Sequence, residues 1–528
     1  MARTNQHLPC PPENFLRPLI KRLHRLGMTD SQIASMVLKQ IDAKTYGISS
    51  STIKKRRSAW KIFGVRQSGH TLQSIAPSVQ QIRMRYPNMG ARDMTKRLRL
   101  EFDVYAPREL VELYLKIEEP EAVAARKRRV FKRRRYWTAG VNDCWAFDQH
   151  DKWKRFGLWF NLGLDVCSGK ILFIKIWWNN RNPRLLGNYY LDAVEKIGAV
   201  PMITQSDPGT ENYSVANMQT IMRQRLDPTL SATLQHRWMV NGMNIKPEIQ
   251  WSQMRSQFSP GFEAVLQHGI DSGLLDMHED LERMLFRRLS IPWLQEELDR
   301  WVDQKNSTTR RANKYKVLPH GIPDLIYECP DEYGAMDFKV PVNPVLISEM
   351  RADFCPHDHP IYQLVPPIFE QHFQAHREAL QFPVVSIANF WEVYNLFLHA
   401  FITAPFDQDL SDVIRTAPSP LQEDIAVGDP VKLLPLPPLR AGLMVEKAAG
   451  QAQGVGAAGR NGIAFEYVGG LTSPDVPQPL LDAVNRQDDE QHANGAEDEG
   501  DDCDLFAEPR YIEFSDDEDD IELPVLGS

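Results

Sequence analysis

The sequence predicts an α/β protein in which a mixed sheet follows basic helical units and precedes a helical region and a disordered acidic tail. Three observations predict this: aromatic and apolar runs of strand length, helical patterns that alternate with a later strand, and a charge that changes sign along the chain. The 528 residues are 42% hydrophobic and 25% charged, which suits a globular protein of roughly three domains. No apolar run reaches the roughly 18 residues of a membrane span, so we expect no membrane partner.

The charge of the chain is strongly asymmetric. Residues 1–140 hold 29 Lys and Arg against 11 Asp and Glu, a net charge of +18, whereas residues 482–528 have a net charge of −16. A basic N-terminal third predicts a polyanionic partner such as DNA, and the acidic end predicts a disordered tail. The six cysteines have no paired spacing, which argues against a disulfide framework.

The first predicted domain, residues 1–65, is a basic helix-turn-helix-like unit. Thr29 and Gln32 have the spacing of a capping box, and a second, strongly basic helix follows Ser50. Four residues of that helix are candidate DNA contacts: Lys54, Lys55, Arg56 and Arg57. The alternative is a small helical bundle with a solvated basic face.

A second basic helical unit is predicted over residues 66–125, with Arg97 as its candidate DNA contact. An Arg-rich linker follows at 126–140. Its candidate DNA contacts are Arg128, Arg129, Lys132, Arg133 and Arg134. Such a run suits a nuclear import signal or a phosphate-contacting linker, and a solvated charged linker is the alternative.

The sheet domain is predicted over residues 141–310. Runs at 158–166 and 171–178, with a shorter run that ends at Asp148, predict three successive antiparallel strands. A helix, a strand that ends near Asp207 and another helix then follow, and residues 258–305 have helical apolar spacing. Three regions complete the chain: a mixed region of unknown role (311–428), a Pro/Gly/Ala-rich linker (429–481) and the acidic tail (482–528).

Three carboxylates are candidate catalytic and metal-binding residues. Asp148 and Asp207 are expected at strand ends, where sites form in open α/β sheets. Pro247 suits the first position of a helix, and Glu248 follows it directly. Hard oxygen ligands favour Mg²⁺ or Mn²⁺, and two such ions activate the attacking oxygen and stabilise the leaving oxygen of a phosphodiester. The chain has 69 acidic residues, so the alternative is that these are ordinary turn or first-turn acids.

The motifs around these acids resemble an integrase catalytic core, most closely that of transposon-derived integrase-like proteins of fungi and animals. The residues that carry the resemblance form ordered blocks at 145–152, 206–212, 244–248 and 251–255, with sequences WAFDQHDK, SDPGTEN, NIKPE and WSQMR. Pro247 departs from the family pattern, which has an aliphatic residue there, and Lys246 stands where arginine is usual. The resemblance covers about residues 15–330.

The resemblance implies an RNase H-like fold, a D,D,E triad formed by Asp148, Asp207 and Glu248, two divalent metal ions, and DNA end processing and strand transfer. It also implies DNA as partner, a nuclear location and a possible homo-oligomer. The rival hypothesis is a domesticated, catalytically silent nucleic-acid-binding protein.

Overall fold

The computed structural model describes residues 8–42, 44–127, 137–240, 243–310, 317–381, 383–416 and 431–437. The proposed linker contacts Arg128, Arg129, Lys132, Arg133 and Arg134 lie outside these ranges, and so does the predicted acidic tail. In the part of the chain that is described, no helix combines the length and the apolar character needed to cross a membrane.

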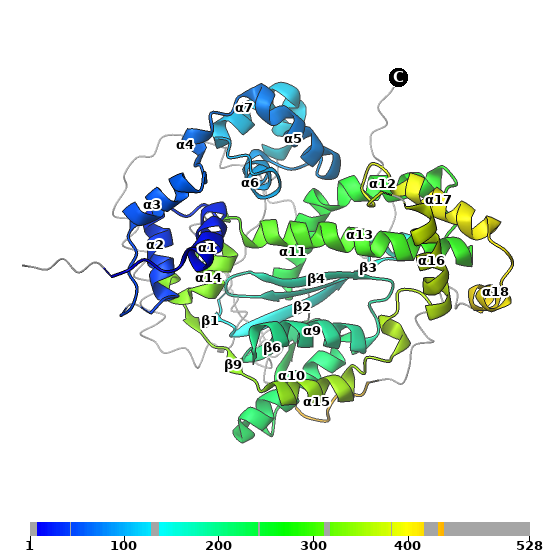
Figure 1. Ribbon diagram of the computed structural model, residues 1–528. Coiled ribbons are helices and arrows are strands. Elements are labelled where there is room, and N and C mark those ends of the chain that lie inside the picture. The colour runs from blue at the N-terminus through cyan, green and yellow to red at the C-terminus, as the bar shows by residue number, and fades with distance from the viewer. Residues whose placement is uncertain are drawn as a thin grey trace, which may run out of the picture. The chain divides into compact units, whose positions relative to one another are not determined.

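A five-stranded mixed sheet forms the centre of the protein (Figure 1). Its strands are β2 (Cys144–His150), β3 (Trp159–Asp165), β4 (Ile171–Trp177), β6 (Ile203–Ser206) and β7 (His236–Trp238). They lie in the order β4-β3-β2-β6-β7, and only β3 runs opposite to the other four. This arrangement is consistent with an RNase H-like core, so the predicted α/β fold class is confirmed.

The central strands consist of buried residues on both faces of the sheet. Every residue of β3 is buried, and so are the first four of β2. A strand covered on both faces appears in the sequence as a continuous apolar run rather than an alternating one. The predicted antiparallel order of the first three strands is confirmed by the pairing of β2 with β3 and of β3 with β4.

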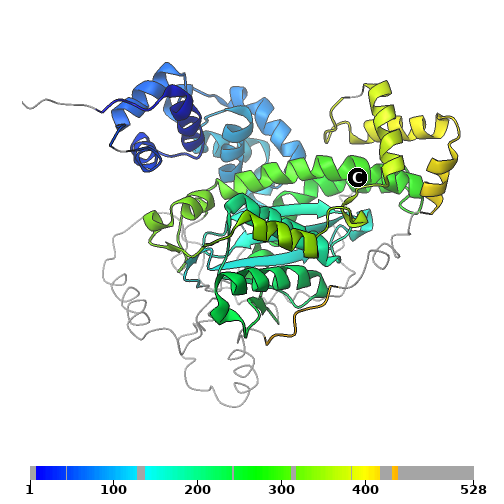
Figure 2. The same cartoon turned by 60° about the horizontal axis from the view of Figure 1, so that its bottom comes forward.

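Helices cover both faces of the sheet (Figures 1 and 2). They are α9 (Pro183–Ile197), α10 (Tyr213–Leu226), α11 (Ile245–Gln257), α12 (Ser259–Asp271) and α13 (Asp280–Asn306). α9 and α10 lie on one side, and the 27-residue α13 runs along the other. The helical spacing predicted over residues 258–305 corresponds to α12 and α13, and α13 continues through Pro292.

The edge strand β4 is protected by amide side chains of α13. The Gln295 side chain accepts a hydrogen bond from Ile176 N and donates one to Ile174 O, both at 3.0 Å. The Asn306 amide does the same at Ile171, with both distances 2.8 Å. These bonds occupy backbone groups that an exposed edge would offer to another chain.

The region after α13 returns to the sheet domain as short strands and helices. β8 (Met336–Asp337) pairs with β1 (Gly140–Val141), and β9 (Val340–Pro341) pairs with β5 (Ala199–Val200). Its helices are α14 (Pro323–Glu328), α15 (Pro344–Phe354), α16 (Pro367–Leu380), α17 (Phe390–Thr403) and α18 (Gln408–Arg415). Because β8 and β9 pair with strands of the sheet domain, this region is structurally continuous with it.

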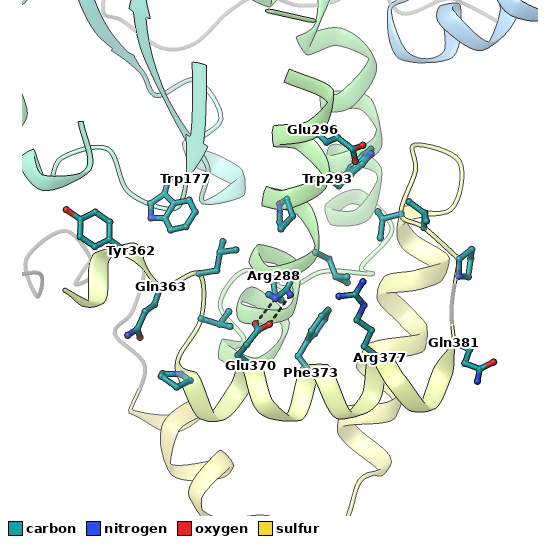
Figure 3. Close-up of a pocket in the computed structure, with 18 residues that line it drawn as sticks. Trp177, Arg288, Trp293, Glu296, Tyr362, Gln363, Glu370, Phe373, Arg377 and Gln381 are labelled. Carbon is teal, nitrogen blue, oxygen red and sulfur yellow. Dashed lines mark hydrogen bonds and ion pairs between the residues drawn. The ribbon is translucent and has the colours of Figure 1, made fainter. Parts of the chain in front are cut away.

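A cavity of about 960 Å³ lies between α13, α16 and the segment before α16 (Figure 3). Trp177, Trp293 and Phe373 contribute to its lining, and Arg288 forms a two-pronged ion pair with Glu370 at 2.6 and 2.9 Å. The lining contains none of the three candidate carboxylates, so this cavity is separate from the candidate active site.

Among the described residues, eight helices precede the sheet domain. They are α1 (Glu13–Arg25), α2 (Asp30–Lys39), α3 (Ser50–Ala59), α4 (Val65–Ser68), α5 (Leu72–Arg85), α6 (Ala91–Phe102), α7 (Arg108–Glu118) and α8 (Pro120–Lys127). The predicted capping box at Thr29 and Gln32 is present at the start of α2. α1, α2 and α3 share an apolar core that includes Leu16, Ile33 and Ile53.

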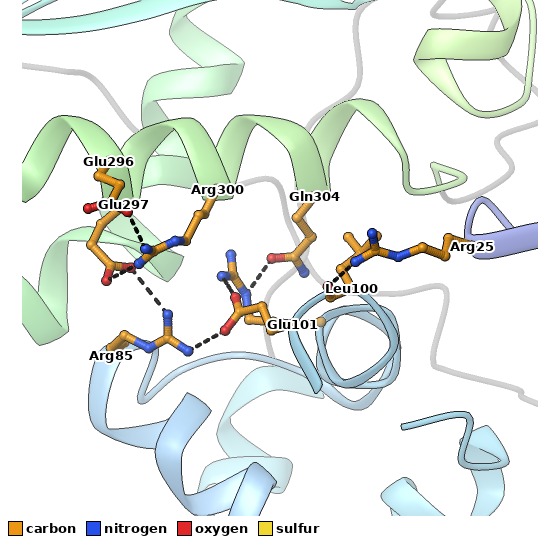
Figure 4. A network of polar contacts seen from close by, with 9 residues as sticks. Arg25, Arg85, Leu100, Glu101, Glu296, Glu297, Arg300 and Gln304 are labelled. Atoms are coloured by element: carbon orange, nitrogen blue, oxygen red, sulfur yellow. Dashed lines mark hydrogen bonds and ion pairs between the residues drawn. The ribbon is translucent and has the colours of Figure 1, made fainter. Parts of the chain in front are cut away.

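Buried charged groups join α5 and α6 to α13 (Figure 4). Arg85 forms ion pairs with Glu101 and, at 3.2 Å, with Glu297. Arg97 pairs with Glu101 and donates a 2.7 Å hydrogen bond to Gln304 Oε1. Because salt screens buried pairs less than exposed ones, this contact is expected to persist at physiological ionic strength.

Lys96, beside this network on α6, is a buried cation that we predict to make stability pH-dependent. Burial, followed by the nearby Arg99, lowers the pKa of Lys96 from 10.5 to about 7. At a pH between these two pKa values, the unfolded chain binds a proton at Lys96 that the folded chain does not. The free energy of unfolding therefore rises with pH across that window. Lys96→Met should raise the thermal midpoint at pH 6, and the gain should shrink as the pH approaches 10. A gain that is the same at both pH values would contradict this.

Candidate active site

The register of two parallel strands brings Asp148 and Asp207 together. β2 pairs with β6 through Trp145 with Thr204 and Ala146 with Gln205. Asp148 and Asp207 each lie two residues beyond the last of these pairs, so they occupy equivalent positions where the two strands separate. The sequence predicted that Asp148 lies at the end of its strand. This prediction is wrong, because β2 continues to His150 along β3.

Helix α11 brings Glu248 within electrostatic reach of Asp148. Just before the helix, Asn244 donates a 2.7 Å hydrogen bond to Phe147 O, and Trp251 Nε1 donates one of 2.9 Å to Asp148 Oδ2. Glu248 precedes Trp251 by three residues, and residues at this spacing share a helix face. α11 begins at Ile245, so Pro247 is its third residue rather than its first, still within the turn where proline is tolerated.

The charges of Asp207 and Glu248 both act on Asp148. Burial raises the pKa of Asp148 well above its usual value, and the charges of Asp207 and Glu248 raise it further. Hydrogen bonds from Gln149 N and Trp251 Nε1 act in the opposite direction, because they favour the carboxylate. Burial and the neighbouring Glu211 also raise the pKa of Asp207. The structure thus gathers negative charge that a cation would stabilise.

The donor chemistry of this site fits a hard divalent cation. Asp207 Oδ1 is buried and accepts no hydrogen bond from any described residue. Carboxylate oxygens are the ligands that Mg²⁺ and Mn²⁺ prefer. In the described ranges, no three His, Cys, Asp or Glu side chains are gathered closely enough to hold a metal ion. Metal binding at this site would therefore require the acids to draw closer together.

The loop after β6 is fixed by a buried amide. Asn212, fully buried, donates to Asp207 O at 3.1 Å and to Glu211 Oε1 at 3.3 Å, and its own oxygen accepts from Gln149 Nε2 at 3.0 Å. At Gly209 a Cβ atom would lie 1.9 Å from Glu211 Oε1, so a side chain there would displace Glu211. The loop therefore holds Asp207 in relation to β2.

His236 on β7 fixes the strand that precedes Asp207. Its ring nitrogens lie 2.8 Å from Thr204 Oγ1 and 3.0 Å from Ser206 Oγ. Burial lowers the pKa of His236 to about 3, so the ring is neutral at physiological pH. A neutral imidazole donates at one nitrogen and accepts at the other, which suits a bridge between two hydroxyl groups.

Sequence reasoning missed the residues that support the acids: Trp251, Asn244 and His236. Only Trp251 had a usable signal, namely its three-residue spacing from Glu248 in a helix-like segment. Asn244 opens the NIKPE block, but that motif gives no sign of its bond to Phe147 O, and nothing local to His236 indicates its contacts with β6.

The candidate DNA contacts differ in their surroundings. Lys54 and Lys55 are exposed on α3. Arg57 pairs with Asp30, and Arg56 lies 3.7 Å from Glu13. The prediction for Arg97 is contradicted, because this side chain is only 1% exposed and its guanidinium lies 3.9 Å from the Tyr86 ring centre. Arg97 is a structural residue, since Glu101, Gln304 and Tyr86 surround the group that would contact phosphate.

The sheet topology, with acids on β2, after β6 and on α11, places the sheet domain in the RNase H-like class. Residues 135–321 match the family described as Integrase core domain. The match supports an integrase catalytic core of the retroviral integrase superfamily in this segment, as the sequence resemblance predicted, and it supports an integrase- or transposase-like function in general. A comparison with curated proteins found no match.

Proposed function

We propose that the protein binds DNA and catalyses divalent-metal-dependent phosphoryl transfer, namely DNA end processing and strand transfer. The observation that supports this proposal is that Asp148 and Asp207 follow paired positions of β2 and β6, and that the charges of Asp207 and Glu248 both raise the pKa of Asp148. The match to an integrase core supplies the reaction class.

In this proposal the three carboxylates hold Mg²⁺ or Mn²⁺, which supplies charge stabilisation at the phosphodiester when bound. Trp251 and Gln149 N orient Asp148, while Asn212 and His236 hold the strand and loop that carry Asp207. These supports matter because a ligand displaced by about 0.5 Å weakens a metal site. The residues thus position the ligands and leave the reacting oxygens to the DNA and water.

We propose that α3 contacts DNA phosphates through Lys54 and Lys55. Exposed lysines release counterions on binding, so replacing both with alanine should make the slope of log affinity against log salt shallower by about 2. Replacing Lys196 and Lys339, which are exposed and lie outside the basic helical units, is the matched control and should leave the slope unchanged. Fluorescence anisotropy with labelled duplex DNA measures both. Equal slopes for the two double variants would exclude α3 from the interface.

The rival proposal, a catalytically silent DNA-binding protein, makes a different prediction for the same preparation. Wild-type protein with Mn²⁺ and DNA ends would then bind DNA with the salt dependence above but join nothing. Strand joining that requires Asp148 excludes this rival. The nuclear location and a homo-oligomer remain part of our proposal, supported by the implied DNA substrate and by the resemblance.

A further inference from the structure

A short segment far along the chain, residues 431–437 (VKLLPLP), lies against α10; we call it the strap. The Asn217 side chain contacts its backbone twice: Nδ2 donates to Lys432 O at 2.8 Å, and Oδ1 accepts from Leu434 N at 3.0 Å. A third bond runs from Leu234 N to Pro437 O at 3.0 Å. The strap is thus bound at both ends, and its last bond lies directly before β7.

On the face of α10 that holds the strap, polar side chains form hydrogen bonds with the backbone of neighbouring segments. Asn217, Thr220 and Gln224 have the spacing of one helix face. Thr220 Oγ1 accepts from Gln235 N at 2.9 Å, and Gln224 Nε2 donates to Leu230 O and Thr233 O, both at 3.1 Å. Asn217 is only 1% exposed, and both of its amide bonds go to the strap. The docked strap thus covers the Asn217 amide and satisfies both its donor and its acceptor.

The strap is bound by its backbone rather than by core packing. None of residues 431–437 belongs to the hydrophobic clusters formed by the described residues. Its side chains are half-buried or exposed, and Leu436 N bonds to Leu434 O at 2.8 Å around Pro435. Such a contact resembles a bound peptide more than an integral part of the fold.

We propose that Asn217 and the backbone at Leu234 form a peptide-docking site on the core, and that the strap of the same chain is its resident ligand. The ligand class is a leucine- and proline-rich peptide that offers a C=O group and, two residues later, an N–H group. Attachment to the same chain gives the strap an effective concentration on the order of millimolar, so a weak site stays occupied. Docking holds Pro437 beside β7, the edge strand next to β6.

The test uses full-length protein in which Gly and Ser replace residues 431–437, together with a labelled VKLLPLP peptide. Anisotropy should show binding to this emptied chain and at least tenfold weaker binding to wild type, whose site is occupied. Asn217→Ala in the emptied chain should weaken binding about thirtyfold, the equivalent of two lost hydrogen bonds of roughly 1 kcal/mol each. Circular dichroism checks that this variant folds.

A second arm leaves Asn217 intact. A peptide N-methylated at Leu434 lacks the N–H donor but keeps every side chain, and it should bind the emptied chain at least tenfold more weakly. Equal binding of the methylated peptide, or no binding of VKLLPLP to the emptied chain, overturns the proposal. A wild-type dimer that the Gly-Ser replacement dissociates overturns the assignment of the ligand to the same chain.

Discussion

Replacing Asp148 with asparagine should abolish metal-dependent strand joining, with a loss on the order of 1000-fold or more. Asp148 occupies the central position: the charges of both other acids act on it, and Gln149 N and Trp251 Nε1 orient its two oxygens. Asparagine keeps the shape but removes the charge that a divalent cation requires. Joining of labelled DNA ends in Mn²⁺ measures the effect.

The same variant should remain folded. Loss of a buried charge favours the folded state, whereas a single amide oxygen satisfies only one of the two donors that face Asp148, so these effects oppose each other. We expect a thermal midpoint within a few degrees of wild type. Asp151→Asn, an exposed acid three residues away, is the matched control and should join DNA normally. Normal joining by Asp148→Asn would remove this residue from the active site.

Replacing Arg97 with methionine should lower the free energy of unfolding by about 3 kcal/mol. The substitution removes the ion pair to Glu101, the hydrogen bond to Gln304 and the contact with the Tyr86 ring. Glu101 keeps Arg85 as a partner, so the loss is smaller than for a buried acid left alone.

Two comparisons distinguish a structural role of Arg97 from a role in DNA contact. Arg92→Met, an exposed position on the same helix, should change stability by less than about 0.5 kcal/mol. The salt dependence of DNA binding by folded Arg97→Met protein should match that of wild type. An Arg97 variant of normal stability with a shallower salt slope would restore the original DNA-contact hypothesis.

The sequence was sufficient for features that depend on local pattern. The buried runs of β3 and β4 predicted strands because both faces of the sheet are covered, and the Thr29 capping box depends only on a residue three positions away. The integrase resemblance proposed the three acids through short ordered motifs. These features need no knowledge of which distant segments meet.

The remaining features depend on which segments, distant in the sequence, lie together in the fold. The adjacency of Asp148 and Asp207 requires β2 to pair in parallel with β6, across an intervening hairpin and helix. Arg97 looked like one more cation in a basic segment, because nothing nearby in sequence shows that α13 covers it with Gln304. The strap at 431–437 likewise meets Asn217 only in the fold.

Calorimetric titration of full-length protein with Mn²⁺ tests most directly whether the carboxylates form one metal site. Wild type and Asp151→Asn should release the same heat of binding, whereas Asp148→Asn, Asp207→Asn and Glu248→Gln should each lose it. Unchanged Mn²⁺ binding in all three substituted proteins would show that these acids hold no metal together, and would contradict the account.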